Sequence, residues 1–149
     1  MTDKNIPLVY SCSGCSSAAQ MANYLAVSLD RAGSGEMSCI AGVGGHVKKI
    51  VKVAQSGRKV IAIDGCPLAC VKACLDNYQI VPDMHIELTK LGVSKKQHED
   101  FDSRQANEIL KKLQQVISET FAEMPKPGKC LTNCPVEGTF MTTSAGRQI

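Results

Sequence analysis

The chain has 149 residues, enough to fold as one domain around a hydrophobic core without disulfide staples. Its net charge of +3 is small and no basic run is interleaved with aromatic residues, so we expect no nucleic-acid partner. No stretch approaches the ~18 apolar residues of a membrane span, and the first residues lack the pattern of a secretory signal. We therefore expect a cytoplasmic protein, in which eight cysteines indicate metal or redox chemistry before a disulfide framework.

Segments with strand and helix character alternate along the chain. Apolar runs predict strands at about 7–11, 37–43 and 59–64, and alternating polar and apolar residues predict a half-exposed edge strand at about 84–91. Helical periodicity predicts helices at about 17–32, 46–56 and 103–121, and a further helix whose first residue is Pro67. From residue 124 the composition changes to Pro, Gly, Thr and Ser. We therefore divide the chain into a domain at 1–123 and a tail at 124–149, which carries Cys130 and Cys134.

Alternating strands and helices predict an α/β fold with three layers, in which helices cover both faces of an open, mostly parallel four-stranded sheet. Two strand orders are compatible with this pattern. In the flavodoxin-like order 2-1-3-4, the carboxyl ends of strands one and three are neighbours. In the order 3-2-1-4, strand two separates them. The first order is predicted if the cysteines that follow strands one and three act together.

Five cysteines follow these two strands. Cys12 and Cys15 form a Cys-x2-Cys turn after strand one, and Cys66, Cys70 and Cys74 follow strand three. A Cys-x2-Cys turn can chelate one metal ion, and structural zinc sites commonly pair such turns. Residues four apart share a helix face, and a helix N-terminus favours thiolate over thiol. We therefore predict Cys12, Cys15, Cys66 and Cys70 as metal ligands, with Cys74 as a reserve ligand or an inert packing residue.

Other residues near the predicted strand ends have simpler interpretations. Cys39, in the middle of the second predicted strand, is expected to be a small buried apolar residue. His46 follows a glycine-rich turn and is expected to cap a helix and face solvent, and His85 is expected at the surface. Asp64 ends the third strand, where a capping role or a hydrogen bond that supports a cysteine-bound centre is expected.

Two motifs resemble a known family. Ser11-Cys12-Ser13-Gly14-Cys15-Ser16 and Ile63-Asp64-Gly65-Cys66-Pro67-Leu68-Ala69-Cys70 are similar to the DGC-domain family, and the resemblance covers roughly residues 6–118. That family is described as zinc-binding, without an established reaction. The resemblance implies a cysteine-bound metal, and the matching positions are Cys12, Cys15, Asp64, Cys66 and Cys70.

The residues leave several functions open. Four thiolates suit zinc, and they suit an iron–sulfur cluster equally well. A Cys-x2-Cys turn between a strand and a helix also resembles the placement of a thioredoxin-type dithiol, so a redox or sulfur-transfer protein that uses Cys12 and Cys15 is the alternative to a metal-binding module. Cys130 and Cys134 in the tail are candidates to complete the site. No Ser-His-acid arrangement is evident, and no reaction or protein partner is assigned.

Overall fold

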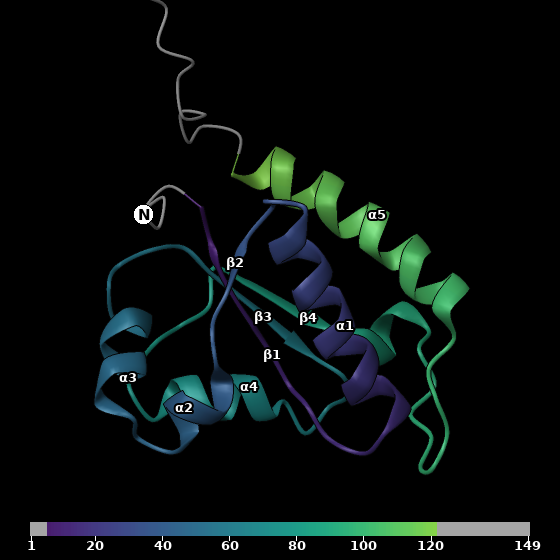
Figure 1. Ribbon diagram of the computed structural model, residues 1–149, viewed down its shortest axis with the longest axis horizontal. Coiled ribbons are helices and arrows are strands. Elements are labelled where there is room, and N and C mark those ends of the chain that lie inside the picture. Colours follow the sequence, from purple (N-terminus) through teal and green to yellow (C-terminus); the bar gives the residue numbers. More distant parts are fainter. Residues whose placement is uncertain (1–5, 122–149) are drawn as a thin grey trace, which may run out of the picture.

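Figure 1 shows the computed structural model, which describes residues 6–121. Its centre is a parallel sheet of four strands in the order β2-β1-β3-β4, as predicted. The strands are β1 (Leu8–Ser11), β2 (Glu36–Met37), β3 (Val60–Asp64) and β4 (Met84–Glu87). β1 and β3 are paired along their length, from Leu8 opposite Val60 to Ser11 opposite Ile63. The loops that follow β1 and β3 therefore leave the sheet side by side.

Helices cover both faces of the sheet, which gives the expected three layers (Figure 1). α1 packs on β1, β2 and β3 and also contacts α5, whereas α4 packs on β3 and contacts α2, which contacts α3. A short 3-10 helix, η1, follows β4 directly. The helices are α1 (Ser17–Arg31), α2 (Ile40–Gly44), α3 (Lys48–Ala54), α4 (Cys70–Asp76), η1 (Leu88–Leu91) and α5 (Ser103–Thr120).

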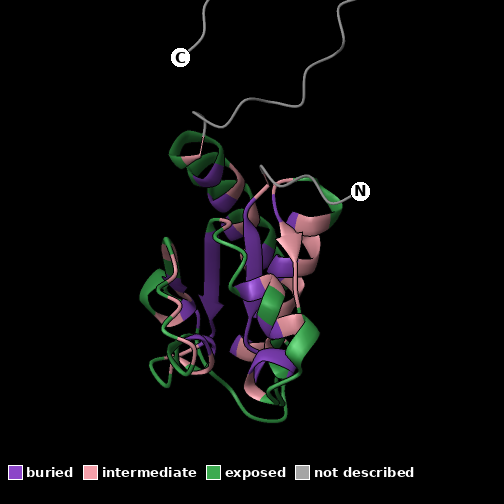
Figure 2. Cartoon of the chain, turned by 90° about the vertical axis from the view of Figure 1, so that its left-hand side faces the viewer, coloured by how far each residue is buried: buried purple, intermediate pink, exposed green. Residues whose placement is uncertain are grey.

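Two buried strands, β1 and β3, and one apolar face of α1 form much of the hydrophobic core. Every residue of β1 and of β3 is buried, as expected for central strands of a parallel sheet that is covered on both faces. In α1 the buried residues recur at helical spacing and face the sheet. Figure 2 shows the buried residues in the strands and on the inward sides of the helices. This packing fixes the positions of the two strand ends that carry the cysteines.

The second predicted strand was wrong over most of its length. β2 ends at Met37, and Ile40–Gly44 forms the helix α2. Cys39 is exposed at the N-cap of α2, where its Sγ accepts a hydrogen bond from the N–H of Gly42 at 3.4 Å. Gly42 lies so close to Ile50 that a Cβ there would be 2.9 Å from that side chain. Short apolar runs do not distinguish strand from helix, and here capping and packing favour the helix.

Two predicted boundaries were also wrong. α4 begins at Cys70 instead of Pro67, because Cys66 to Ala69 form a turn in which the Ala69 N–H donates to the Cys66 carbonyl at 3.1 Å. Ala69 has a φ of 49°, in the left-handed region, so the helix cannot extend back through it. The fourth strand ends at Glu87, and residues 88–91 form η1. The predicted tail at 124–149, with Cys130 and Cys134, lies outside the described residues.

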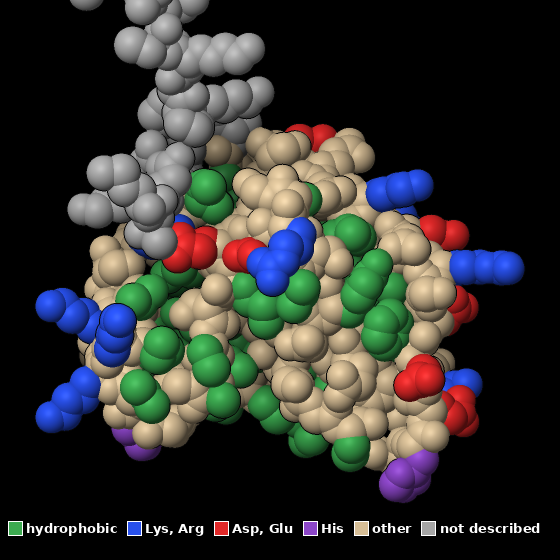
Figure 3. Space-filling model, viewed as in Figure 1, with side chains coloured by type: hydrophobic (Ala, Val, Ile, Leu, Met, Phe, Trp, Pro, Cys, Tyr) green, Lys and Arg blue, Asp and Glu red, His purple; other side chains and the backbone are tan. Residues whose placement is uncertain are grey.

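Charged side chains surround the molecule without forming one basic surface on the face shown in Figure 3. Most Lys and Arg side chains on that face project from its two sides and one lies near the middle, with Asp and Glu side chains close to several of them. None of the helices in the described part of the chain is both long and apolar enough to cross a membrane.

Candidate functional site

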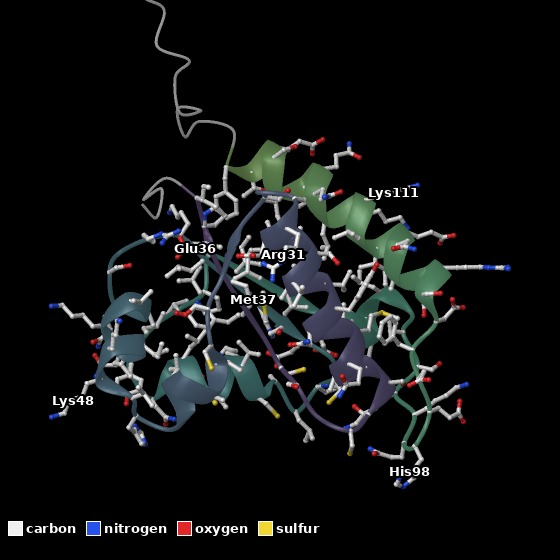
Figure 4. All side chains as sticks on the ribbon, viewed as in Figure 1. Arg31, Glu36, Met37, Lys48, His98 and Lys111 are labelled. Atoms are coloured by element: carbon white, nitrogen blue, oxygen red, sulfur yellow. The ribbon has the colours of Figure 1, made fainter. Side chains whose placement is uncertain are left out.

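Four of the predicted ligands line one pocket at the carboxyl ends of β1 and β3. Cys12 and Cys15 come from the loop after β1, and Cys66 and Cys70 come from the segment between β3 and α4. The pocket has a volume of about 190 Å³. Figure 4 shows several sulfur atoms along the lower edge of the molecule, below the strands. The predicted strand order therefore brings together thiols that are far apart in the sequence.

Cys12 forms the buried part of the pocket. It is 8% exposed, and its Sγ accepts a hydrogen bond from the N–H of Gly65 at 3.1 Å. Burial raises the pKa of the Cys12 thiol to about 11, the hydrogen bond from Gly65 opposes this shift, and negative charge on Asp64, Cys70 and Cys66 adds to it. Cys12 is therefore a protonated thiol at neutral pH unless a cation replaces the proton.

The glycine of the Asp64-Gly65-Cys66 motif is required by a close approach to α1. A Cβ at Gly65 would lie 2.7 Å from the carbonyl carbon of Ala18 and 2.9 Å from the N of Ala19. Both contacts are with backbone, which a side-chain rotation cannot relieve. Gly65 therefore lets the segment after β3 pass against the start of α1, close enough for its N–H to reach the Cys12 sulfur.

Asp64 anchors the helix that carries Cys70. Its carboxylate is 1% exposed and accepts hydrogen bonds from the N–H groups of Val71 at 2.8 Å and Lys72 at 3.4 Å. The N-cap residue, Ala69, has no side chain that could accept these donors. Asp64 therefore caps α4 from the end of the preceding strand. His85 is exposed, as predicted, and donates from Nε2 to the same carboxylate at 2.9 Å.

Cys70 and Cys74 have different surroundings although they are four residues apart on α4. Cys70 is the first residue of the helix, is exposed and lines the pocket. Cys74 lies one turn further along, does not line the pocket and packs against α2, where a Cβ on Gly44 would be 3.0 Å from its Sγ. Burial raises the pKa of the Cys74 thiol, and charges on Cys70 and Asp64 add to the effect. The structure thus places Cys74 in a packing position.

Two residues of the pocket carried no recognisable signal in the sequence. Lys95 donates from Nζ to the Sγ of Cys66 at 3.3 Å, and the thiol of Cys15 donates to Oε1 of Gln97, also at 3.3 Å. Both belong to the loop between η1 and α5, where polar residues ordinarily face solvent. Only the three-dimensional arrangement brings this loop to the ends of β1 and β3.

The four thiols share the pocket without converging on one point. Within residues 6–121, no three Cys, His, Asp or Glu side chains are arranged so that they could hold a metal ion. The donor set is nevertheless the one that soft metals prefer, since thiolate ligands select zinc, copper(I) and iron–sulfur clusters. The thiol side chains would have to rotate toward a common centre for a single ion to bind.

The comparison with known families agrees with this chemistry. Residues 8–113 match the family model of the DGC domain. The chain belongs to the DGC-domain family. This family is one of cysteine-containing domains for which a metal ion is the expected ligand. The sequence of this chain is also 49% identical over 116 residues to the anaerobic and virulence modulator AnvM of Pseudomonas aeruginosa. The match covers 78% of this chain and 88% of AnvM. No solved structure matches the chain.

Proposed function

We propose that this DGC-domain protein binds a soft metal ion through the thiolates of Cys12, Cys15, Cys66 and Cys70. The observation that carries the proposal is that these four thiols, from two loops more than 50 residues apart, line one pocket. Zinc is the first candidate, because it takes four thiolate ligands in tetrahedral sites and needs no redox partner. We further propose that the protein works in the cytoplasm, where such thiols stay reduced.

The residues around the pocket have distinct parts in this function. Cys15 and Cys70 are exposed, so an incoming ion meets them before it meets the buried thiol of Cys12. Because the pKa of Cys12 is raised to about 11, the ion must displace the proton of this thiol, and binding tightens as the pH rises. The Gly65 N–H already donates to the Cys12 sulfur and would steady the thiolate. The bound ion would join the loops after β1 and β3.

An iron–sulfur cluster is the second candidate, because four cysteine thiolates can also hold one. The four thiols share the pocket without converging on one point, and a cluster offers them more than one iron to bind. The relative AnvM is named an anaerobic and virulence modulator, and an oxygen-sensitive site in this chain would be consistent with that name.

A dithiol redox function is less well supported. An attacking cysteine works as a thiolate and usually has a lowered pKa, whereas burial raises the pKa of Cys12 to about 11. Cys15 is exposed, but its expected partner in a Cys-x2-Cys dithiol is this buried, protonated Cys12. We therefore place metal binding above thiol–disulfide exchange.

The test is a metal analysis of protein prepared without oxygen. The full chain is purified anaerobically, and zinc, iron and acid-labile sulfide are measured beside the visible spectrum. We expect a stoichiometric metal in the wild type and its loss in Cys66→Ser and Cys70→Ser. A colourless zinc protein supports the first candidate, and a brown protein with labile sulfide supports the second.

Cys39→Ser is the matched control for these variants. Cys39 does not line the pocket, and a serine can still accept the capping hydrogen bond from Gly42. This variant should keep its metal. A wild type without metal, or equal metal content in Cys66→Ser and Cys39→Ser, would contradict the proposal. A double variant, Cys130→Ser with Cys134→Ser, shows whether the tail supplies ligands, since loss of metal there would add to the ligand set.

A further inference from the structure

The loop that contains Lys95 is fixed to the start of α1. The N–H of Ser17 donates to the carbonyl of Lys96 at 2.9 Å, and the N–H of Lys96 donates to Oγ of Ser17 at 3.0 Å. The hydroxyl of Ser17 in turn donates to the carbonyl of Ser94 at 3.1 Å. Ser17 itself is buried. The backbone on both sides of Lys95 is therefore tied to the same helix start that follows Cys15.

This anchored backbone directs Lys95 and Lys96 to different partners. The Nζ of Lys95 lies 3.3 Å from the Sγ of Cys66, whereas the Nζ of Lys96 pairs with the carboxylate of Glu99 at 2.9 Å. Among the described residues that line the pocket, Lys95 is the only Lys, Arg, Asp or Glu. Lys95 thus places one positive charge at the thiol pocket, whereas the adjacent Lys96 does not line it.

A nearby positive charge stabilises a thiolate site for a divalent ion. Four thiolates around a divalent cation carry two negative charges in excess. The carboxylate of Asp64 is 1% exposed and directly precedes Gly65, whose N–H contacts the Cys12 sulfur at 3.1 Å, so it adds to the negative potential near the pocket. An ammonium beside one sulfur lowers the free energy of the fully deprotonated, metal-bound state.

We propose that Lys95 is the charge-balancing residue of the thiol pocket, and that it tightens divalent metal binding through its contact with Cys66. This inference rests on the proposed function and deepens it. Lys95 is a positioning residue, since it acts through the Cys66 sulfur and does not bind the ion. Because its side chain is exposed, its contribution is that of a solvent-screened charge.

The experiment measures zinc affinity by anaerobic competition with a chromophoric chelator, on the full chain, at low and at high salt. Lys95→Ala should weaken zinc binding about five-fold at low salt. This factor corresponds to the upper end of the interaction energies of exposed charge pairs. The factor should shrink toward one in 1 M salt, where the Debye length is about 3 Å. Lys95→Arg should recover most of the affinity, and Lys96→Ala should bind zinc as the wild type does.

Each outcome bears on one of the two proposals. Equal affinity in Lys95→Ala and Lys96→Ala, with zinc bound by the wild type, overturns the role of Lys95 and leaves the metal site standing. A different result is that Lys95→Ala loses zinc affinity to the same extent at high salt, with no recovery in Lys95→Arg. That result reflects altered packing of the loop and also overturns the role of Lys95. A wild type that binds no zinc contradicts the zinc form of the proposed function, whatever the Lys95 variants do.

Discussion

Asp64 and His85 connect two neighbouring parallel strands, since Nε2 of His85, the second residue of β4, lies 2.9 Å from Oδ2 of Asp64, the last residue of β3. The same carboxylate accepts two N–H groups of the first turn of α4. One buried side chain therefore ties β3 and β4 to the helix that presents Cys70. This arrangement explains in physical terms why an aspartate stands first in the Asp64-Gly65-Cys66 motif.

Replacing Asp64 by alanine should destabilise the fold. Two helix N–H groups and the His85 imidazole lose their acceptor, and we expect a decrease of about 2–3 kcal/mol in the free energy of unfolding. Urea denaturation followed by circular dichroism measures it. Asp76→Ala is the control, because Asp76 pairs with Lys72 on an exposed helix face and should change stability by less than about 0.5 kcal/mol. Similar losses in the two variants would contradict the capping role.

Gly65→Ala should be destabilising for a steric reason. The new methyl group would lie within 2.9 Å of three backbone atoms of Ala18 and Ala19, so the start of α1 and the segment after β3 must separate. We expect a loss of about 2–3 kcal/mol, as for other overpacked sites. Leu68→Ala, three residues on at a position that is 72% exposed, should have little effect on the same urea curve. If both variants unfold at the wild-type midpoint, the close approach is not rigid.

The thiol of Cys12 should make the metal-free protein less stable at high pH. Its folded pKa of about 11 lies above the ordinary value of 9.0, so the folded state binds this proton more tightly than the unfolded state. The resulting stabilisation is complete below about pH 9 and disappears as the pH rises through about 11. Unfolding midpoints measured between pH 8 and 11 should fall less steeply in Cys12→Ala. Tyr10, whose pKa burial also raises, contributes equally to both proteins. Parallel slopes would show that Cys12 titrates normally.

Asp83 should contribute to stability in the opposite pH range. Burial by itself raises the pKa of this carboxyl, but hydrogen bonds from Lys59 at 2.8 Å and from the N–H of Val60 at 2.9 Å outweigh it and hold the pKa below 3.8. Its contribution is therefore complete above about pH 4 and is lost as the pH falls through the lowered folded value. Acid titration of the far-ultraviolet signal should show a smaller loss of stability in Asp83→Asn than in the wild type. The same acid slope in both would contradict the assignment.

The sheet and the grouping of the thiols were predictable because they depend on strong local patterns. Two continuous apolar runs are typical of central parallel strands, and both are buried as β1 and β3. The order 2-1-3-4 followed from the requirement that the cysteines after these strands share one site, and the structure confirms that order. It places Cys12, Cys15, Cys66 and Cys70 in one pocket, whereas their role as ligands stays a prediction.

The details that escaped prediction depend on contacts between distant segments. Residues 40–44 form a helix because Cys39 caps it and Gly42 packs under Ile50, neither of which periodicity can indicate. The left-handed Ala69 moves the start of α4 to Cys70, although Pro67 is well suited to a first helical turn. Lys95 reaches Cys66 only because Ser17 holds the loop in place.

The sequence separation of 53 residues between Cys12 and Gly65 also determines when the pocket can exist during synthesis. Until β3 has left the ribosome and paired with β1, the nascent chain offers only the Cys12–Cys15 turn and the isolated Cys39. Closing a loop of this length has an entropic cost that the contacts of the central strands must offset before the second pair of sulfurs arrives. The four-thiol pocket is thus completed late in synthesis, once the parallel strand pair has formed.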